Sequence, residues 1–414
     1  MTNLILLLIP LSVAHGATVV TADNLESFVN RNPNVMALRD RLEAAQTMKG
    51  RLGRSFLPKL VATYGQERFS TGPYDGVTQP YGGLSAELNL YNSGKDRLED
   101  ERRSHLARAA ALDGVLLRYQ TLAELQRGLA HHAYLVEVKG VLTEALSGNE
   151  VNLRRARRRT EAGQGTTTDL LDFRQQKLEL QQELMSLEVE LGVVRRMTAT
   201  LLGEEPEAPL MIDFANAHPE HTKEEPVSAT AGGLLVQRAN IDRQIAALEL
   251  RQQRRWWTPS FDVYGYAMRF TQKEREYNPA SAREDVTVGF RFTVPFFDGG
   301  EGARAASSTS AAVRAQAHEV RARELEAHRR SQDAVQKLEL AHALIHGAEE
   351  SVAVMSDYRK GIMDEYARGV KNSPDVLQAS KRWIEAKVRY ADLKKNYQFA
   401  RVESLYLSSL GGAQ

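Results

Sequence analysis

The hydrophobic pattern along this chain is of two kinds, and the first kind predicts β-strands. In several short segments apolar and polar residues alternate one by one, which gives a strand one apolar face and one polar face. The clearest case places on one face Val286, Val288, Phe290, Phe292 and Val294. A second case places on one face Leu84, Ala86, Leu88 and Leu90. Together with the segments that precede them, these cases predict four strands, at about residues 58–69, 83–92, 259–270 and 285–297.

The second kind of pattern places charged and apolar residues at helical spacing and predicts two very long helices, at about residues 94–162 and 300–368. Neither segment contains proline, and at 1.5 Å per residue each helix would reach about 100 Å. Apolar residues step by three and four along both segments, as in the seam of a coiled coil. The predicted seams are Leu112, Val115, Tyr119, Leu122, Leu129, Ala133 and Val136 in the first helix, and Ala334, Leu338, Ala341, Ile345, Ala348, Val352, Met355, Ile362 and Tyr366 in the second.

Shorter helices are predicted at about residues 24–56, 168–202, 231–257 and 373–410. Each would span about half the length of a long helix. We therefore expect each long helix to lie beside two short helices stacked end to end, with a strand pair at one end and a helical tip at the other.

The two halves of the chain match each other at an offset of about 200 residues, which indicates an internal duplication. The matching landmarks are Leu57-Pro58 with Thr258-Pro259, Asn92-Ser93-Gly94 with Asp298-Gly299-Gly300, and Gly163 with Gly369. Between the halves, residues 204–230 carry several prolines among glutamates and are predicted to be a linker. The sequence thus divides into a segment 1–16, a first repeat 17–203, the linker, and a second repeat 231–414.

Residues 1–16 combine an apolar run with small residues and are predicted to be a signal peptide. After them we find no apolar run long enough for a transmembrane helix, so a membrane-spanning part would have to be a barrel. Four strands cannot close a barrel, and open sheet edges cannot lie in lipid. Three chains would supply twelve strands. We therefore expect a homotrimer that spans a lipid membrane, with a wet lumen lined by Glu87, Asn89, Arg291 and Thr293.

Composition excludes several other function classes. Lys and Arg number 54 against 53 Asp and Glu, so no net field attracts nucleic acid. The absence of cysteine excludes disulfides, thiolate metal sites and a lipid-bearing cysteine. No phosphate-binding loop, nucleophile elbow or HExxH helix is present, so we expect no enzymatic activity and no cofactor. His342 and His346 have the spacing of a metal pair but lack a nearby third ligand, and no metal site is expected.

Taken together, these pieces resemble the TolC-type outer-membrane efflux proteins over essentially the whole mature chain. The resemblance rests on Asn32-Pro33, Leu57-Pro58, Tyr91-Asn92-Ser93-Gly94, Phe297-Asp298-Gly299-Gly300, and the tip glycines with their downstream Asp-x-Leu. It implies a mainly α fold with a β-barrel portion, in which a trimer forms a twelve-stranded outer-membrane barrel continued by a periplasmic α-helical barrel.

The resemblance also implies the function and its partners. The chain would be the passive exit duct of a tripartite efflux or type I secretion system in the outer membrane of a Gram-negative bacterium. It would be opened by docking to a periplasmic adaptor, or membrane fusion protein, and through it to an inner-membrane pump of the RND or ABC type. The cargo stays open among drugs, metal ions, polypeptides and polysaccharides. The alternative is a soluble or peripheral coiled-coil scaffold, although exposed Phe290 and Phe292 would then promote aggregation.

The predicted helical tips hold the candidate functional residues. By resemblance, Gly163, Gly165 and Gly369 would receive the adaptor, although glycine also simply ends helices. Three copies of the aspartates after the tips would form carboxylate rings that favour cations, and the resemblance implies a periplasmic entrance gate made of Asp169, Asp172, Tyr366, Lys371 and Asp375. The alternative is that the aspartates cap the returning helices. The second half has Gln378 where the first has Asp172, so one ring of charge is missing.

Arginines crowd the end of the first long helix: Arg154, Arg155, Arg157, Arg158 and Arg159. We interpret them as a solvated face or as partners in ion pairs with Glu150 and Glu161. The alternative is contact with an acidic surface of the adaptor.

Overall fold

The computed structural model describes residues 18–21, 24–50, 52–69, 77–163, 165–212, 233–270 and 283–411. The predicted signal peptide and residues 213–230 of the predicted linker lie outside the described residues. The chain forms two compact units. The sheet unit contains Leu38–Asp113 and Leu235–Glu324, and the helical unit contains Met1–Ala37, Gly114–Leu234 and Leu325–Gln414.

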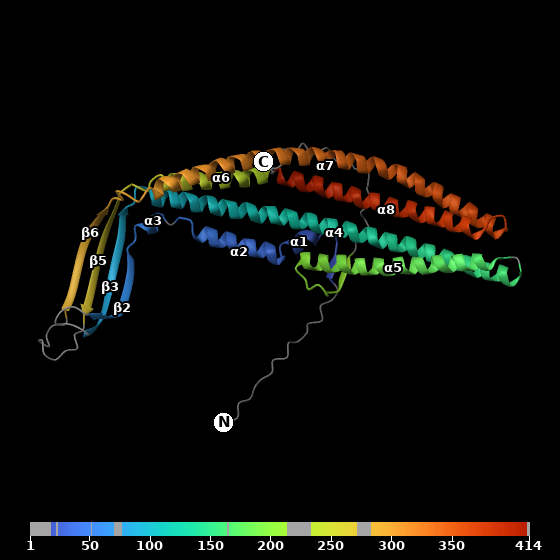
Figure 1. Ribbon diagram of the computed structural model, residues 1–414, viewed down its shortest axis with the longest axis horizontal. Coiled ribbons are helices and arrows are strands. Elements are labelled where there is room, and N and C mark those ends of the chain that lie inside the picture. The colour runs from blue at the N-terminus through green and yellow to red at the C-terminus, as the bar shows by residue number, and fades with distance from the viewer. Residues whose placement is uncertain are drawn as a thin grey trace, which may run out of the picture. The chain divides into compact units, whose positions relative to one another are not determined.

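The sheet unit contains four antiparallel strands in the order β2-β3-β5-β6 (Figure 1). Their bounds are Lys59–Phe69 for β2, Val77–Tyr91 for β3, Ser260–Phe270 for β5 and Arg283–Thr293 for β6. β3 begins earlier than the predicted residue 83, because pairing with β2 continues through Pro80, beyond the point where β5 stops pairing with β3. β6 stops at Thr293 rather than at 297, since Pro295 cannot donate to a sheet ladder.

The strand register places on one face of the sheet the alternating apolar side chains of β3, β5 and β6, together with Leu60 and Ala62 of β2. Val263 on β5 pairs with Leu88 on one side and with Phe290 on the other, and the rings of Phe261 and Phe290 lie 6.0 Å apart. The apolar side chains on β6 are strongly exposed, at 73% for Phe290 and 79% for Val288. This face is therefore not buried against helices of the chain. A water-soluble scaffold would need such an apolar face to be buried.

Three long or intermediate helices meet in the sheet unit: the start of α4 (Lys95–Glu161), α6 (Gly233–Gln253) and the start of α7 (Glu301–Ala367). Arg238 of α6 donates to Asp113 of α4 at 2.7 Å. Trp256 packs so closely on α7 that a Cβ atom at Gly302 would lie 2.3 Å from its Cγ. Only glycine fits at this position, which fixes how α7 begins.

The helix predicted over residues 24–56 is wrong as a single element. It is divided into α1 (Leu25–Val29), α2 (Pro33–Thr47) and α3 (Leu52–Ser55). Proline has no N–H group and disfavours helical geometry in the residue before it, so a helix begins anew at Pro33. Gly50 has φ of 66°, which ends the second segment. α6 likewise ends at Gln253 rather than at about 257.

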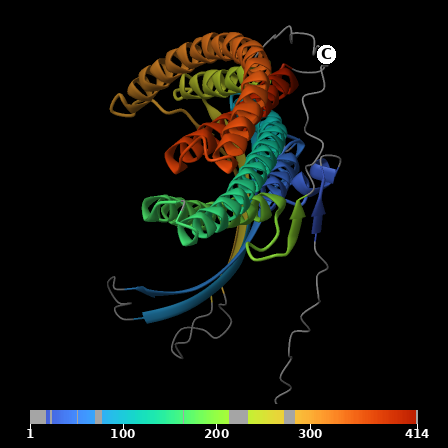
Figure 2. The ribbon, with the colours of Figure 1, turned by 90° about the vertical axis from the view of Figure 1, so that its right-hand side faces the viewer.

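The helical unit pairs each long helix with a returning helix. α5 (Thr167–Leu202) runs beside α4, and α8 (Ser373–Leu410) runs beside α7, in both views (Figure 1 and Figure 2). α4 and α7 have 67 residues each, which corresponds to about 100 Å. The predicted long helices and returning helices are thus confirmed to within a residue or two. None of the helices in the described ranges is long and apolar enough to cross a membrane.

A small parallel pair of strands, β1 (Thr18–Val20) and β4 (Leu210–Ile212), also belongs to the helical unit. We did not predict it. β4 lies inside the segment that we predicted to be a linker, and Val20 is fully buried in a cluster with α1, α4 and α5.

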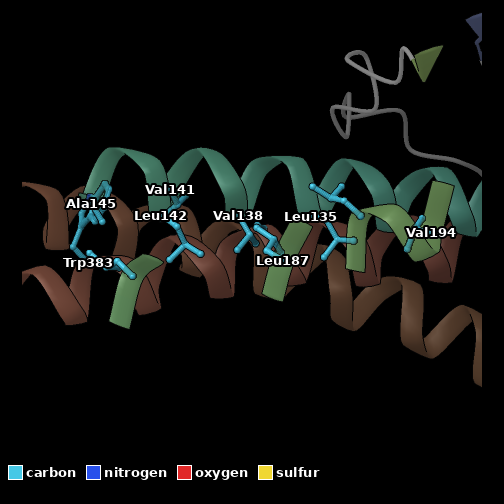
Figure 3. Packing of buried hydrophobic residues seen from close by; sticks show 11 residues of the cluster. Leu135, Val138, Val141, Leu142, Ala145, Leu187, Val194 and Trp383 are labelled. Carbon is cyan, nitrogen blue, oxygen red and sulfur yellow. The ribbon is translucent and has the colours of Figure 1, made fainter. Parts of the chain in front are cut away.

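Apolar side chains from α4, α5 and α8 form the main core cluster of the helical unit (Figure 3). The predicted seam of α7 is buried at Ala334, Ala341, Ile345, Ile362 and Tyr366. The predicted seam of α4 is partly wrong, because Val136 is half exposed while Leu135 and Val138 are buried. α4 packs against more than one helix, so its buried stripe is wider than a strict heptad seam.

Candidate functional site at the helical tips

Glycine ends both long helices at the tips. Gly163 follows α4 with φ of 71°, and Gly369 follows α7 with φ of 84°. L-residues rarely adopt this left-handed conformation, so both positions favour glycine for the backbone alone. Gly165 is favoured for a different reason, since a Cβ atom there would lie in tight contact, 3.1 Å from the Cβ of Arg159. Both tip glycines are exposed, and contact with an adaptor stays a prediction.

Two of the candidate aspartates cap the returning helices. The Asp169 backbone N–H donates to the Thr166 hydroxyl at 3.2 Å, and the Asp375 backbone N–H donates to the Asn372 side chain at 3.3 Å. Each aspartate side chain in turn accepts from the backbone of its N-cap residue, which completes a capping box. The capping role, which we left open as the alternative, is therefore present at both tips.

A buried hydroxyl group is one link between the two tips. Ser373 is fully buried, and its Oγ lies 2.5 Å from Asp169 Oδ1 and 3.0 Å from Asp172 Oδ2. One hydroxyl carries one proton, so it donates to one of these carboxylates at a time. Burial alone would raise the pKa of Asp169, but the hydrogen bonds from Ser373 and Thr166 outweigh it and lower that pKa. We had not singled out Ser373, whose corresponding residue in the first tip is Thr167.

Tyr366 is 2% exposed and lies in the core of the tips. Its ring meets the edge of Phe173 at 5.8 Å, and the Arg159 guanidinium lies 5.2 Å from the ring centre. Arg159 also donates to the Tyr366 carbonyl oxygen at 3.3 Å. Burial, together with the charge of Asp169, raises the pKa of Tyr366.

The structure thus brings together some of the predicted gate residues and not others. Asp169, Asp172 and Tyr366 lie at one junction between the tips, with Ser373 and Arg159 between them. The Tyr366 hydroxyl makes no hydrogen bond within the described ranges. Lys371 is half-buried and forms no ion pair within them.

Replacing Ser373 by alanine should loosen this junction. We expect a loss of about 1 kcal/mol in the local opening free energy, because the carboxylates lose a shared donor but keep access to water. Amides in the first turns of α5 and α8 should then exchange hydrogen about fivefold faster. Thr167→Ala is the matched control, since Thr167 is the counterpart of Ser373 and is exposed.

The pH dependence of this exchange gives a second readout. Folding lowers the pKa of Asp169. The ionised carboxylate therefore stabilises the tip junction fully at pH values above its unfolded pKa, and this stabilisation is lost as the pH falls through the folded pKa. In the Ser373→Ala variant, the stability of the junction should fall less as the pH is lowered. An unchanged pH profile in the variant would show that Ser373 does not act through Asp169.

The polar face of the sheet carries the residues that we expected in a lumen. In the strand register Glu87 and Asn89 lie on the same face as Arg291 and Thr293. The Arg291 guanidinium lies 5.0 Å from the centre of the Tyr264 ring and 3.9 Å from the Glu87 carboxylate.

Comparison with known proteins connects this geometry to a family. The family model described as outer membrane efflux protein matches residues 24–193 and 227–408. No curated protein matches the sequence.

Solved structures share the fold over nearly the whole chain. The outer membrane protein VceC of Vibrio cholerae is 15% identical with a TM-score of 0.74, covering 94% of this chain and 96% of its own. The CmeC outer membrane channel of Campylobacter jejuni is 14% identical with a TM-score of 0.77, covering 95% and 87%. The MtrE outer membrane channel of Neisseria gonorrhoeae, in its open state, is 16% identical with a TM-score of 0.72, covering 94% and 89%.

Proposed function

Because the chain belongs to the outer membrane efflux protein family, we propose that it is the passive exit duct of a tripartite efflux system or of a type I secretion system. Membership of the family places the chain in the outer membrane, as an efflux channel with a large helical part in the periplasm. The finer role rests on what the sheet and the tips require.

One observation carries the proposal: the sheet has an exposed apolar face and two open edges. β2 and β6 each pair with one neighbour among the described strands, and Val286, Val288, Phe290 and Phe292 are all exposed on the apolar face. Lipid can cover such a face, but unpaired edge amides cannot remain in lipid. Three copies of the chain would close the edges into a twelve-stranded barrel with the polar face inward.

The partners are proposed from the needs of a passive duct. A duct moves solute only down a gradient, so we propose that the free energy of export comes from an inner-membrane pump of the RND or ABC type. We propose that a periplasmic adaptor connects that pump to the tips at Gly163, Gly165 and Gly369. We also propose that Asp169, Asp172, Tyr366, Lys371 and Asp375 form the periplasmic entrance gate. The duct itself would perform no catalysis and need no cofactor.

The proposal is tested by extraction and conductance. The protein should require detergent for extraction from outer membranes, run on gels as a trimer that heating dissociates, and conduct ions in planar lipid bilayers. Monomers that are released without detergent and form no channel would contradict it. The soluble scaffold is not proposed, because the exposed apolar face of the sheet argues against it.

A further inference from the structure

The C-terminal end of α4 is a concentrated basic surface. Residues 154–161 contain five arginines and one glutamate. Four of the arginines, Arg154, Arg155, Arg157 and Arg158, are exposed. Arg159 is not part of this exposed surface, because it contacts Tyr366 within the tip junction.

The nearest carboxylates of the chain compensate this surface only in part. The expected ion pair of Glu150 with an arginine is wrong, because Glu150 pairs with Lys177 at 2.7 Å, although Lys177 and then Arg154 both lower the pKa of its carboxyl. The solvated face, our other interpretation, agrees with the exposure of the arginines. Asp169 and Asp172 accept from Ser373. In the part of the chain that the structure describes, the four exposed arginines form no ion pair.

The second tip carries much less positive charge. The corresponding residues 360–367 at the end of α7 contain one lysine, one aspartate and one glutamate, and Arg368 and Lys371 follow them. Gly369 stands where the first tip has Gly163, with the same left-handed backbone. The duplication has therefore kept the shape of the tip but not its charge.

Helix stability does not explain the difference. The negative end of the helix dipole favours cations only within the last turn, where Arg158 and Arg159 already lie. Arg154 lies further back and has Arg157 and Arg158 at the i+3 and i+4 positions, a spacing at which like charges destabilise a helix. A solvated face is compatible with the exposed arginines, but it gives no reason for their restriction to one of two duplicated tips, whereas a binding partner of opposite charge does.

We propose that the first tip, between α4 and α5, docks an acidic surface of the periplasmic adaptor, and that the second tip docks the adaptor without this charge contact. The inference rests on the proposed function. Exposed guanidinium groups bind carboxylates as paired hydrogen-bond donors. The open space around Gly163, where a Cβ atom would meet nothing within 4 Å, lets another polypeptide backbone approach beside them. In a trimer, strongly basic and weakly basic tips would then alternate and give the adaptor two kinds of docking site.

The probe for this test is a designed helical hairpin with glutamates along its turn, compared with the same hairpin carrying glutamines. Trimers in lipid nanodiscs should bind the glutamate hairpin at least about tenfold more tightly, because charge complementarity mainly speeds association. The difference should nearly vanish between about 0.1 M and about 1 M salt, since the Debye length falls from about 10 Å to about 3 Å. The double variant Arg154→Glu, Arg158→Glu should lose the preference.

The matched control is Lys360→Glu, because Lys360 occupies the position of Arg154 in the second tip; it should keep the preference. Equal binding of both hairpins by the wild type, or an undiminished preference in the double variant, would overturn the inference. So would phosphatidylglycerol vesicles that bind the first tip as strongly as the acidic hairpin does. Wild-type trimers that conduct ions but show no preference would sink this inference alone, whereas trimers that fail to conduct would sink the proposed function.

Discussion

Replacing Val288 by arginine is expected to remove most of the trimer from the outer membrane. Val288 is 79% exposed at the middle of β6, on the apolar face. An arginine on the lipid face of an outer-membrane barrel costs about 2–4 kcal/mol near the midplane, and a trimer carries the substitution three times. A free-energy cost of 1.4 kcal/mol changes an equilibrium by about a factor of ten. The amount of heat-sensitive trimer in outer-membrane extracts should therefore fall by more than about tenfold.

The neighbouring residue supplies the control. Thr287 lies one position earlier on the same strand, so its side chain points to the polar face, opposite Tyr266 of β5. Thr287→Arg adds the same charge at nearly the same depth, and it should leave assembly close to normal. Equal losses in the two variants would mean that the face we assign to lipid is wrong.

These faces could be predicted from the sequence because a strand repeats every two residues. The alternation at Val286–Val294 fixed which side chains share a face before any register was known. The start of β3 could not be predicted in this way. Pro80 and Gly82 lie before the predicted start of the strand at residue 83, yet pairing with β2 extends through them, and pairing partners are not visible in one segment alone.

Helix ends were predictable where the sequence carries its own caps. Thr166 and Asn372, each three residues before an aspartate, mark the starts of α5 and α8. The break at Pro33 was visible in the sequence, but we extended one helix through it, because its charged and apolar spacing continues on both sides. The β1–β4 pair joins residues far apart in the chain, and strands of three residues give almost no periodicity to detect.

The sequence predicted which residues lie at the candidate site, but it did not predict the contacts between them. The tip glycines and aspartates stand out in the duplicated sequence, and the structure places them at the ends of the helices. Ser373 does not stand out, because a serine beside an N-cap residue is common and its contact with Asp169 depends on how α5 and α8 pack. The arginines after residue 153 were visible, but only the packing showed that Glu150 pairs with Lys177 instead.

Trp383 is the residue of the helical unit whose loss should cost most. It is 2% exposed and belongs to the cluster that α4, α5 and α8 share (Figure 3). The Arg359 guanidinium lies 3.5 Å and the Lys387 ammonium 4.5 Å from the centre of its ring. Both cations also contact Glu144 of α4, at 3.1 Å each. The indole thus contacts two cations, and both of them pair with the same carboxylate.

Trp383→Ala should lower the free energy of opening around this cluster by about 3–5 kcal/mol, through the cavity and the lost contacts. Hydrogen exchange of the amides in α8 near residue 383 would measure the loss. Trp383→Phe keeps an aromatic ring under the cations but removes part of the indole ring system together with the N–H group that donates to Ser356 at 3.1 Å; its cost should be about 1–2 kcal/mol, well below that of alanine.

The loss of stability in the Trp383→Ala variant should also remain local, because a second set of contacts lies one heptad further along α8. Lys394 lies 4.8 Å from the centre of the Tyr390 ring and pairs with Glu137 at 2.6 Å, which repeats the arrangement of Lys387, Trp383 and Glu144. Because this second set has its own aromatic ring and carboxylate, exchange near Tyr390 should change much less than exchange near Trp383. Equal acceleration at both places would show that the two sets open as one cooperative unit and that α4 and α8 are not held by independent contacts.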